Sequence, residues 1–222
     1  FFEFTREFMN LEPEAWSLRW YRQMVGISSI GDTTVVSNKW MLGTRNSFII
    51  GISATFLATA LGTVAALGLS RRNMPFKGTI MAILISPMIV PLIITSAGMF
   101  FFYSKIGLTH TYLGLILAHT ALGTPFVVIT VTATLTGFDT NLIRASQSLG
   151  ADTIRTFFKV IMPLILPGVI SGALFAFITS FDEVVVVMFV GSVEQITIPK
   201  QMWAGLRQET SPVILCMATC LV

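Results

Sequence analysis

Four long uncharged runs constrain the fold of this chain more than any other feature. Residues 46–70, 78–104, 112–136 and 164–181 contain no Asp, Glu, Lys or Arg and are rich in apolar side chains. About 20 such residues suffice to cross the hydrocarbon core of a bilayer as a helix. A helix is favoured in lipid because it pairs its own backbone N–H and C=O groups. The sequence therefore predicts an all-α, polytopic helical membrane protein.

The composition supports a membrane protein and argues against other classes. Hydrophobic residues make up 54% of the 222 residues and charged residues only 11%, whereas soluble domains carry about 25% charged residues. A soluble chain of this length cannot enclose so much apolar surface. The net charge is only +3. The basic residues are scattered between the apolar runs, which excludes the clustered basic face of a nucleic-acid-binding protein.

The sequence divides into two parts. Residues 1–43 are more polar, and their tryptophans suit a membrane–water boundary. We expect them to form a periplasmic or interfacial segment that follows a missing first span. Residues 44–222 are expected to form the transmembrane domain. The final apolar run, from Pro212 to Val222, is shorter than a full crossing, so the last span is expected to be truncated.

A polar interruption at residues 138–163 has the pattern of two short helices joined by a tight turn. Asp139 is placed to cap the first helix, because its carboxylate can accept from free N–H groups of the first turn. Gly150 can end that helix, since glycine enters the left-handed conformation without a Cβ clash. Asp152 can then cap the second helix.

Each of the two short helices is expected to have an apolar face. Leu142, Ala145 and Leu149 fall on one side of the first helix at helical spacing. On the second helix the apolar residues are Ile154, Phe157, Phe158 and Ile161. A charged helical pair between membrane spans, with apolar faces to bury, indicates a docking surface for another protein.

The same stretch carries a family pattern. Arg144-Ala145-Ser146 is followed by Gly150 and then by Ile161-Met162-Pro163. This spacing resembles the cytoplasmic "EAA" loop of the membrane permease subunits of bacterial binding-protein-dependent ABC importers. Arg144 stands where that family usually has Glu, and Ser146 replaces the second Ala. The resemblance implies a MetI-like permease core with a cytoplasmic coupling-helix pair.

The resemblance also implies the partners. ATP and Mg would be held by two cytosolic ATPase subunits, with no cofactor in this chain. A second permease subunit, identical or different, would complete the solute pathway, and a periplasmic solute-binding protein would deliver the solute. The location implied is the bacterial inner membrane. The residues expected to dock the ATPase are Asp139, Leu142, Arg144, Ala145, Ser146, Leu149, Gly150, Ala151, Asp152, Ile154, Phe157 and Phe158.

Within this family the sequence is most similar to the spermidine/putrescine-type permeases, especially over residues 180–190 and 199–212. The resemblance implies a small cationic or amino-acid-derived solute such as a polyamine. Opines, other amino-acid derivatives and metal complexes remain open as solutes.

The basic residues predict the orientation. Two of the loops that fall on one side of the membrane carry six basic and two acidic residues, which by the positive-inside rule makes that side cytoplasmic. The docking loop is therefore expected to face the cytosol. The basic residues are Arg71, Arg72, Lys77, Arg144, Arg155 and Lys159.

Five residues are candidates for the solute pathway. Asp182 and Glu183 would attract a cationic solute, or they form a carboxylate pair at the lipid boundary or a salt bridge with a partner subunit. Pro87 and Pro91 break the second run, as a gate or as a static kink. His119 is ionisable at membrane depth, and it either takes part in transport or forms a hydrogen bond to a neighbouring helix.

The sequence contains no pattern of an enzyme. It lacks a G-x-x-x-x-G-K-[ST] phosphate loop, an HExxH metal site and a plausible pair of nucleophile and base. We therefore expect a non-catalytic membrane subunit, with no metal site, that draws energy from a separate ATPase. The alternative is an ion-coupled secondary carrier or a channel subunit, for which buried ion ligands are expected and only His119 qualifies.

Overall fold

The computed structural model describes residues 21, 24, 33–71, 73–208 and 213–221. Most of the predicted interfacial segment at 1–43, and Arg72 of the predicted basic turn, lie outside these residues. Within the described residues, all of the regular structure is helical, as predicted. The helices are α3 (Thr33–Leu69), α4 (Lys77–Ile89), α5 (Leu92–Ile106), α6 (Tyr112–Thr136), α7 (Asn141–Ser148), α8 (Thr153–Thr156), the π-helical η2 (Phe157–Ile161), α9 (Met162–Phe181), α10 (Val185–Val190), α11 (Ile198–Gln208) and α12 (Val213–Leu221).

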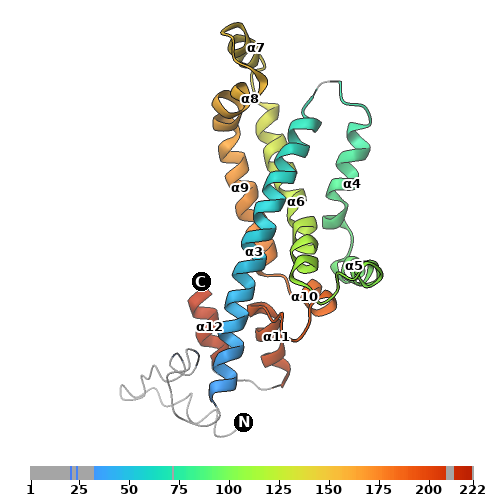
Figure 1. Cartoon of the computed structure of the whole chain (residues 1–222), viewed down its shortest axis with the longest axis vertical. Coiled ribbons are helices and arrows are strands. Elements are labelled where there is room, and N and C mark those ends of the chain that lie inside the picture. Colours follow the sequence, from blue (N-terminus) through green and yellow to red (C-terminus); the bar gives the residue numbers. More distant parts are fainter. Residues whose placement is uncertain (1–20, 22–23, 25–32, 72, 209–212, 222) are drawn as a thin grey trace.

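Three long helices form the body of the molecule. Stretches that are long and apolar enough to cross a membrane are Lys39–Leu69, Tyr112–Thr136 and Thr153–Phe181. They correspond to three of the four predicted runs, and α3 begins well before the expected start at residue 46. Helices α3, α6 and α9 pack along one another (Figure 1).

Small residues let these helices approach closely. A Cβ atom on Gly172 of α9 would lie 2.5 Å from Thr130 Oγ1 and 2.8 Å from the Cα atom of Val127, both on α6. On α3, a Cβ atom on Gly62 would lie 2.7 Å from the Val127 Cβ atom. Because lipid provides no hydrophobic driving force between helices, such close backbone packing is a main source of their association.

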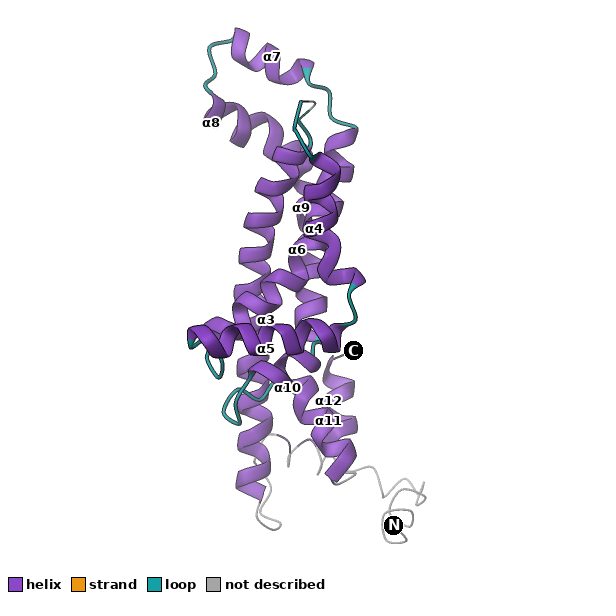
Figure 2. Cartoon of the chain, turned by 90° about the vertical axis from the view of Figure 1, so that its right-hand side faces the viewer, coloured by secondary structure: helices purple, strands orange, loops and turns teal. Residues whose placement is uncertain are grey.

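The second predicted run is broken into two helices. Helix α4 ends at Ile89, α5 begins at Leu92, and the two axes differ by 103°. Pro91 precedes the first residue of α5, whereas Pro87 lies inside α4. The predicted break is confirmed, but it is a turn of more than a right angle. Figure 2 shows α5 lying across the long axis of the bundle.

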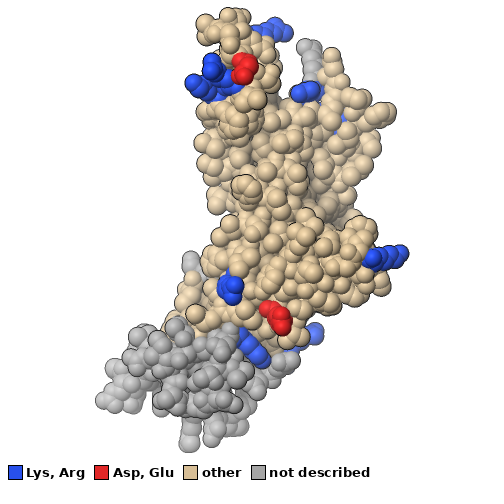
Figure 3. Space-filling model, viewed as in Figure 1, with Lys and Arg blue, Asp and Glu red and all other residues tan. Residues whose placement is uncertain are grey.

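The charged side chains leave an uncharged band across the molecule. Figure 3 shows Lys and Arg at the end that carries α7 and α8 and again in the lower half of the view, with an uncharged band between them on this face. An uncharged band bounded by charged ends is the pattern of a protein that spans a bilayer. The predicted docking loop thus lies at one membrane boundary, and α11 lies toward the other (Figure 1).

Candidate functional site

Asp carboxylates bind the starts of the two short helices at one end of the bundle. Asp152 is the N-cap of α8 as predicted, whereas the N-cap of α7 is Thr140 and Asp139 lies one residue before it. Asp139 Oδ1 accepts a hydrogen bond of 2.9 Å from the N–H of Asn141. Asp152 Oδ1 accepts one of 2.8 Å from the N–H of Arg155. Each carboxylate satisfies a backbone donor that a helix start leaves unpaired and also stabilises the positive end of the helix dipole. We refer to α7 and α8 together as the coupling pair.

The turn within the coupling pair needs a glycine. Gly150 has a φ of +81°, in the left-handed region. Its N–H donates to the carbonyl of Gln147 at 2.9 Å, and the N–H of Ala151 donates to the carbonyl of Ser146 at 3.1 Å. These two bonds form a Schellman motif, which ends a helix and reverses the chain in a fixed geometry. The predicted role of Gly150 as the helix stop is confirmed.

A contact between side chains joins the two helices of the coupling pair. The hydroxyl groups of Ser146 and Thr156 share a hydrogen bond of 2.9 Å. Thr156 is 3% exposed, so this bond is largely shielded from water. Thr156 was not predicted as a site residue. The one sequence feature that could have indicated this contact is a hydroxyl-bearing residue four positions after Asp152.

The coupling pair leaves large apolar side chains uncovered by the rest of the chain. Leu149 is 89% exposed, and Leu142 and Ile154 are also exposed, as is Phe158 of the adjoining η2. The pair projects beyond the ends of the long helices (Figure 1). The contacts seen here thus leave the predicted docking face of Leu142, Ala145 and Leu149 open to a partner.

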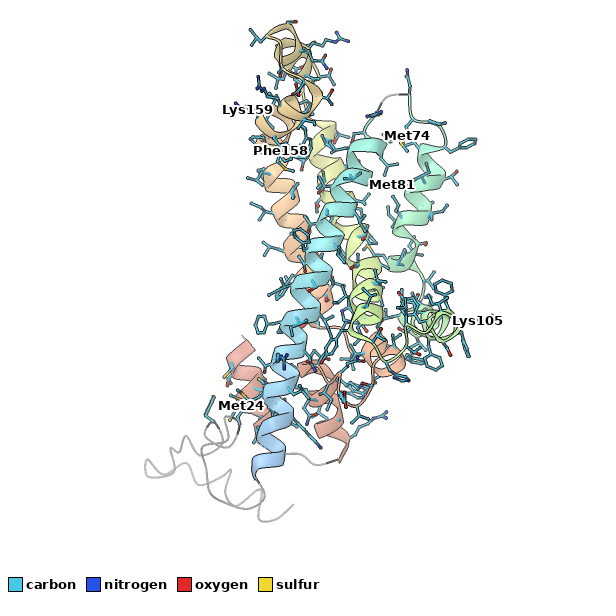
Figure 4. The ribbon with its side chains drawn as sticks, viewed as in Figure 1. Met24, Met74, Met81, Lys105, Phe158 and Lys159 are labelled. Atoms are coloured by element: carbon cyan, nitrogen blue, oxygen red, sulfur yellow. The ribbon has the colours of Figure 1, made fainter. Side chains whose placement is uncertain are left out.

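A cavity of about 600 Å³ lies between the coupling pair and the ends of the long helices. Ile154, Phe157 and Phe158, which were predicted to dock a partner, also line this cavity. Figure 4 shows Phe158 and its neighbour Lys159 at this end of the bundle. The other lining residues are Leu67, Ser70, Arg71, Leu135, Phe138, Thr140, Ile143, Gln147, Thr153, Thr156 and Ile161.

At the opposite end of α9, the predicted carboxylate pair is divided. The side chain of Asp182 is exposed, whereas Glu183 is 7% exposed. Glu183 Oε1 accepts a hydrogen bond of 2.9 Å from the N–H of Val186, at the start of α10. Burial raises the pKa of Glu183, and the backbone N–H groups around it act in the opposite direction. Glu183 is therefore buried and bound to the start of α10, whereas the carboxylate of Asp182 lies on the surface of the molecule.

The other end of α10 is held by Lys200, a residue that the sequence analysis did not single out. Lys200 Nζ donates to the carbonyls of Val187 at 3.3 Å and Ser192 at 3.1 Å. Burial lowers the pKa of Lys200. An acidic residue at the start of α10 and a basic residue at its end both complement the helix dipole. This short helix is also fixed by its buried face of Val186, Val187 and Val190.

His119 is buried between α6 and α9. Its Nδ1 atom lies 2.8 Å from Ser180 Oγ, in the last turn of α9. No described residue forms a hydrogen bond with its Nε2 atom. Because Ser180 precedes Asp182 by two positions, this contact places His119 near the end of α9 that carries Asp182. Pro91 lies at the bend between α4 and α5, and Pro87 lies inside α4.

Asn46 holds the opposite end of the bundle together and was also missed. Its Nδ2 atom donates to the carbonyls of Glu194 at 3.0 Å and Ile196 at 2.9 Å. Its Oδ1 atom accepts from the Tyr112 hydroxyl at 2.9 Å. One buried amide thereby links α3, the start of α6 and the segment after α10. Its position at the start of an uncharged run was the signal in the sequence.

Comparison with known proteins agrees with this architecture. Residues 58–222 match the family described as the binding-protein-dependent transport system inner membrane component. The spermidine/putrescine transport system permease protein PotC of Haemophilus influenzae is 27% identical, over 99% of this chain and 81% of that protein. PotC of Escherichia coli K12 is 25% identical, over 99% and 79%. The putrescine transport system permease protein PotI of the same strain is 28% identical, over 93% and 73%.

The family match covers most of the chain and confirms the resemblance seen at Gly150 and the residues around it. It also agrees with the apolar helices of the structure. The chain belongs to the family of inner membrane components of binding-protein-dependent transport systems, which are non-catalytic permease subunits of bacterial importers.

Proposed function

We propose that this chain is a permease subunit of an ATP-driven polyamine importer and that the coupling pair receives the movement of a cytosolic ATPase. The observation that carries this proposal is a rigid helix pair with an uncovered apolar face. An Asp carboxylate binds a backbone N–H at the start of each helix, the turn is fixed, and Leu149 is 89% exposed. Such a surface favours binding to a partner, because the pair loses little conformational freedom on docking.

The proposed orientation places the coupling pair in the cytosol. The positive-inside rule counts the basic residues of the short loops between spans. The two loops at the end with the coupling pair carry six basic residues, whereas the short loops at the other end carry Lys105, Lys200 and Arg207. Arg71 and Lys77 follow the end of α3, and the coupling pair and η2 add further basic residues at the same end, as Figure 3 shows. These further residues are Arg144, Arg155 and Lys159.

The path of force in this proposal follows the backbone. Helices α8, η2 and α9 run without a break from Thr153 to Phe181. The bond between Ser146 and Thr156 joins α7 to this continuous helical segment. A displacement of α7 by the ATPase would therefore tilt α9 and move its far end, where Ser180 contacts His119. That motion would switch the pathway between its inward and outward openings.

The proposed assembly contains the partners that this mechanism requires. Two cytosolic ATPase subunits would hold ATP and Mg, and a second permease subunit would complete the pathway. A periplasmic binding protein would present the solute at the end that carries α11.

The proposed solute is a polyamine. Relatives that cover most of this chain are named for spermidine and putrescine transport, and both compounds are cations. Asp182 is the stronger of the two carboxylate candidates, since Glu183 is buried and already binds a backbone N–H. We also place His119, Pro87 and Pro91 in the pathway.

Reconstitution tests the proposal as a whole. The complex with its ATPase subunits, placed in liposomes with the binding protein, should accumulate labelled spermidine only when ATP is supplied. Uptake by this chain alone would instead favour the channel or ion-coupled carrier. If the complete complex transports an anionic solute but not spermidine, the proposed solute is wrong.

Docking has its own test. A cysteine introduced at Leu149, in a chain whose Cys216 and Cys220 are replaced by Ala, should cross-link to the ATPase subunit. The matched control is a cysteine at Val193, which is 84% exposed at the opposite end of the molecule. Cross-linking at Val193 and not at Leu149 would contradict the orientation.

A further inference from the structure

The cavity beneath the coupling pair has the size of a site for a small molecule. Its volume of about 600 Å³ lies within the range of roughly 300–1,000 Å³ that is typical of ligand sites. Its walls come from the ends of α3 and α6, from the coupling pair and from η2. Apolar side chains dominate these walls, among them Leu67, Leu135, Ile143, Phe157 and Ile161. An apolar occupant is favoured there because it removes this surface from water.

The charge on the wall of the cavity is positive. Among the described lining residues, Arg71 is the one that carries a charge. The nearby carboxylates of Asp139 and Asp152 do not line the cavity, and both accept hydrogen bonds from helix N–H groups. The cavity therefore combines an apolar wall with a guanidinium that no described residue pairs with, and that can bind an anion. A phosphate is well suited to a guanidinium, because its oxygens match the fork of N–H donors.

The cavity also lies at the level of the membrane boundary. Helix α3 ends at Leu69 and α6 ends at Thr136, and the lining residues Arg71 and Phe138 follow these ends by only two positions. Residues just beyond the end of a spanning helix lie among lipid headgroups. An arginine at this level with an apolar cavity beside it is complementary to a lipid rather than to a free anion in solution.

We propose that this cavity binds one anionic phospholipid. Its phosphate lies on Arg71, and one acyl chain lies against the apolar wall formed by Leu135, Ile143 and Phe157. The proposed orientation would place this lipid in the cytoplasmic leaflet, and the inference depends on the proposed function in that respect alone. A lipid in this place would lie between the coupling pair and the long helices, and would support the coupling pair from below.

Native mass spectrometry of the intact complex provides the test. The complex, still holding its ATPase subunits, would be titrated with phosphatidylglycerol and with phosphatidylcholine of identical acyl chains. We expect the wild type to retain one phosphatidylglycerol in preference to phosphatidylcholine. Arg71→Gln should weaken the retention of phosphatidylglycerol about tenfold, as expected for one charge-assisted contact. The matched control, Lys77→Gln, removes an exposed basic residue at the same end that does not line the cavity and should retain the lipid as the wild type does.

A second variant tests the apolar wall without changing the charge. Ile143→Trp should fill part of the cavity and weaken the retention of both lipids. The proposal is overturned if Arg71→Gln loses no more phosphatidylglycerol than Lys77→Gln, or if the wild type does not distinguish the two lipids. It is also overturned if a photo-crosslinker at position 143 reacts with the ATPase subunit instead of lipid. Bound lipid is counted only on complexes that retain their ATPase subunits. Loss of the ATPase subunits from the wild-type complex would contradict the proposed docking and not the lipid site.

Discussion

The hydroxyl groups of Ser146 and Thr156 lie 2.9 Å apart and join α7 to α8 across the turn at Gly150. The two residues are ten positions apart in sequence, and their bond joins the two helices of the coupling pair into one unit. In the proposed mechanism this bond transmits a push on α7 into α8, η2 and α9. A mutation that removes this bond should therefore impair transport while the ATPase still docks.

Ser146→Ala should reduce coupling while leaving the fold intact. The loss of one hydrogen bond costs about 0.5–1.5 kcal/mol, which is too little to unfold the domain. We expect a smaller stimulation of ATP hydrolysis by the solute-loaded binding protein, measured in liposomes. The matched control is Ser148→Ala, because Ser148 donates only to the carbonyl of Arg144 in its own helix. Equal stimulation in both variants would remove the Ser146–Thr156 bond from the path of force.

Gly150→Val should uncouple ATP hydrolysis from transport. A β-branched residue at a φ of +81° is strained, at a cost of about 1–3 kcal/mol, so the turn should change its geometry. Hydrolysis should continue while uptake per ATP falls. Gly78→Val is the control, since a Cβ atom there meets nothing within 4 Å. Wild-type coupling in Gly150→Val would show that the fixed turn is not required.

The geometry of the coupling pair was predictable because its determinants are local. Asp139, Gly150 and Asp152 act on backbone groups within three residues of themselves. Chain spacing alone fixes such interactions. The cavity beneath the coupling pair was not predictable, because its walls come from α3, α6, α7, α8 and η2, and their meeting depends on the packing of the whole bundle.

Gly172→Ala should destabilise the contact between α6 and α9. The added Cβ atom would lie 2.8 Å from the Cα atom of Val127, so the two backbones would have to separate. Overpacking of this kind costs about 1–3 kcal/mol, and the thermal unfolding midpoint in detergent should fall. Gly98→Ala is the control, since its Cβ atom meets nothing within 4 Å. An unchanged midpoint for Gly172→Ala would show that the helices can separate at little cost.

At the end of the bundle that carries α11, the contacts that were not predicted join residues far apart in the sequence. Asn46 bonds to the carbonyls of Glu194 and Ile196, about 150 positions away. Lys200 binds carbonyls in and after α10, and Glu183 binds the Val186 N–H at the start of this helix. A polar residue within an apolar run shows that a partner is needed but does not say which one. The 103° turn at Pro91 was likewise underestimated, since proline sets a break and packing sets its angle.

Asp182→Asn should weaken the uptake of a cationic solute. Loss of one exposed carboxylate on the pathway removes a charged contact, and we expect the KM for ATP-driven spermidine uptake in liposomes to rise about tenfold. Glu194→Gln is the matched control, because Glu194 is another exposed carboxylate in the segment after α10. A KM that changes equally in both variants would indicate a general effect of surface charge, and an unchanged KM would remove Asp182 from the pathway.

Glu183→Gln should change how stability depends on pH. Burial raises the pKa of Glu183 in the folded protein, so the folded state holds its proton at pH values where the unfolded chain, with a pKa of about 4.3, has released it. The contribution of this group is thus fully present below the unfolded pKa and is lost as pH rises through the folded pKa. Gln keeps an oxygen that can accept from the Val186 N–H but does not titrate. The unfolding midpoint of wild type minus that of Glu183→Gln, measured at a series of pH values from 4 upward, should therefore fall with increasing pH. A difference that rises with pH would mean that the backbone N–H groups around Glu183 outweigh its burial.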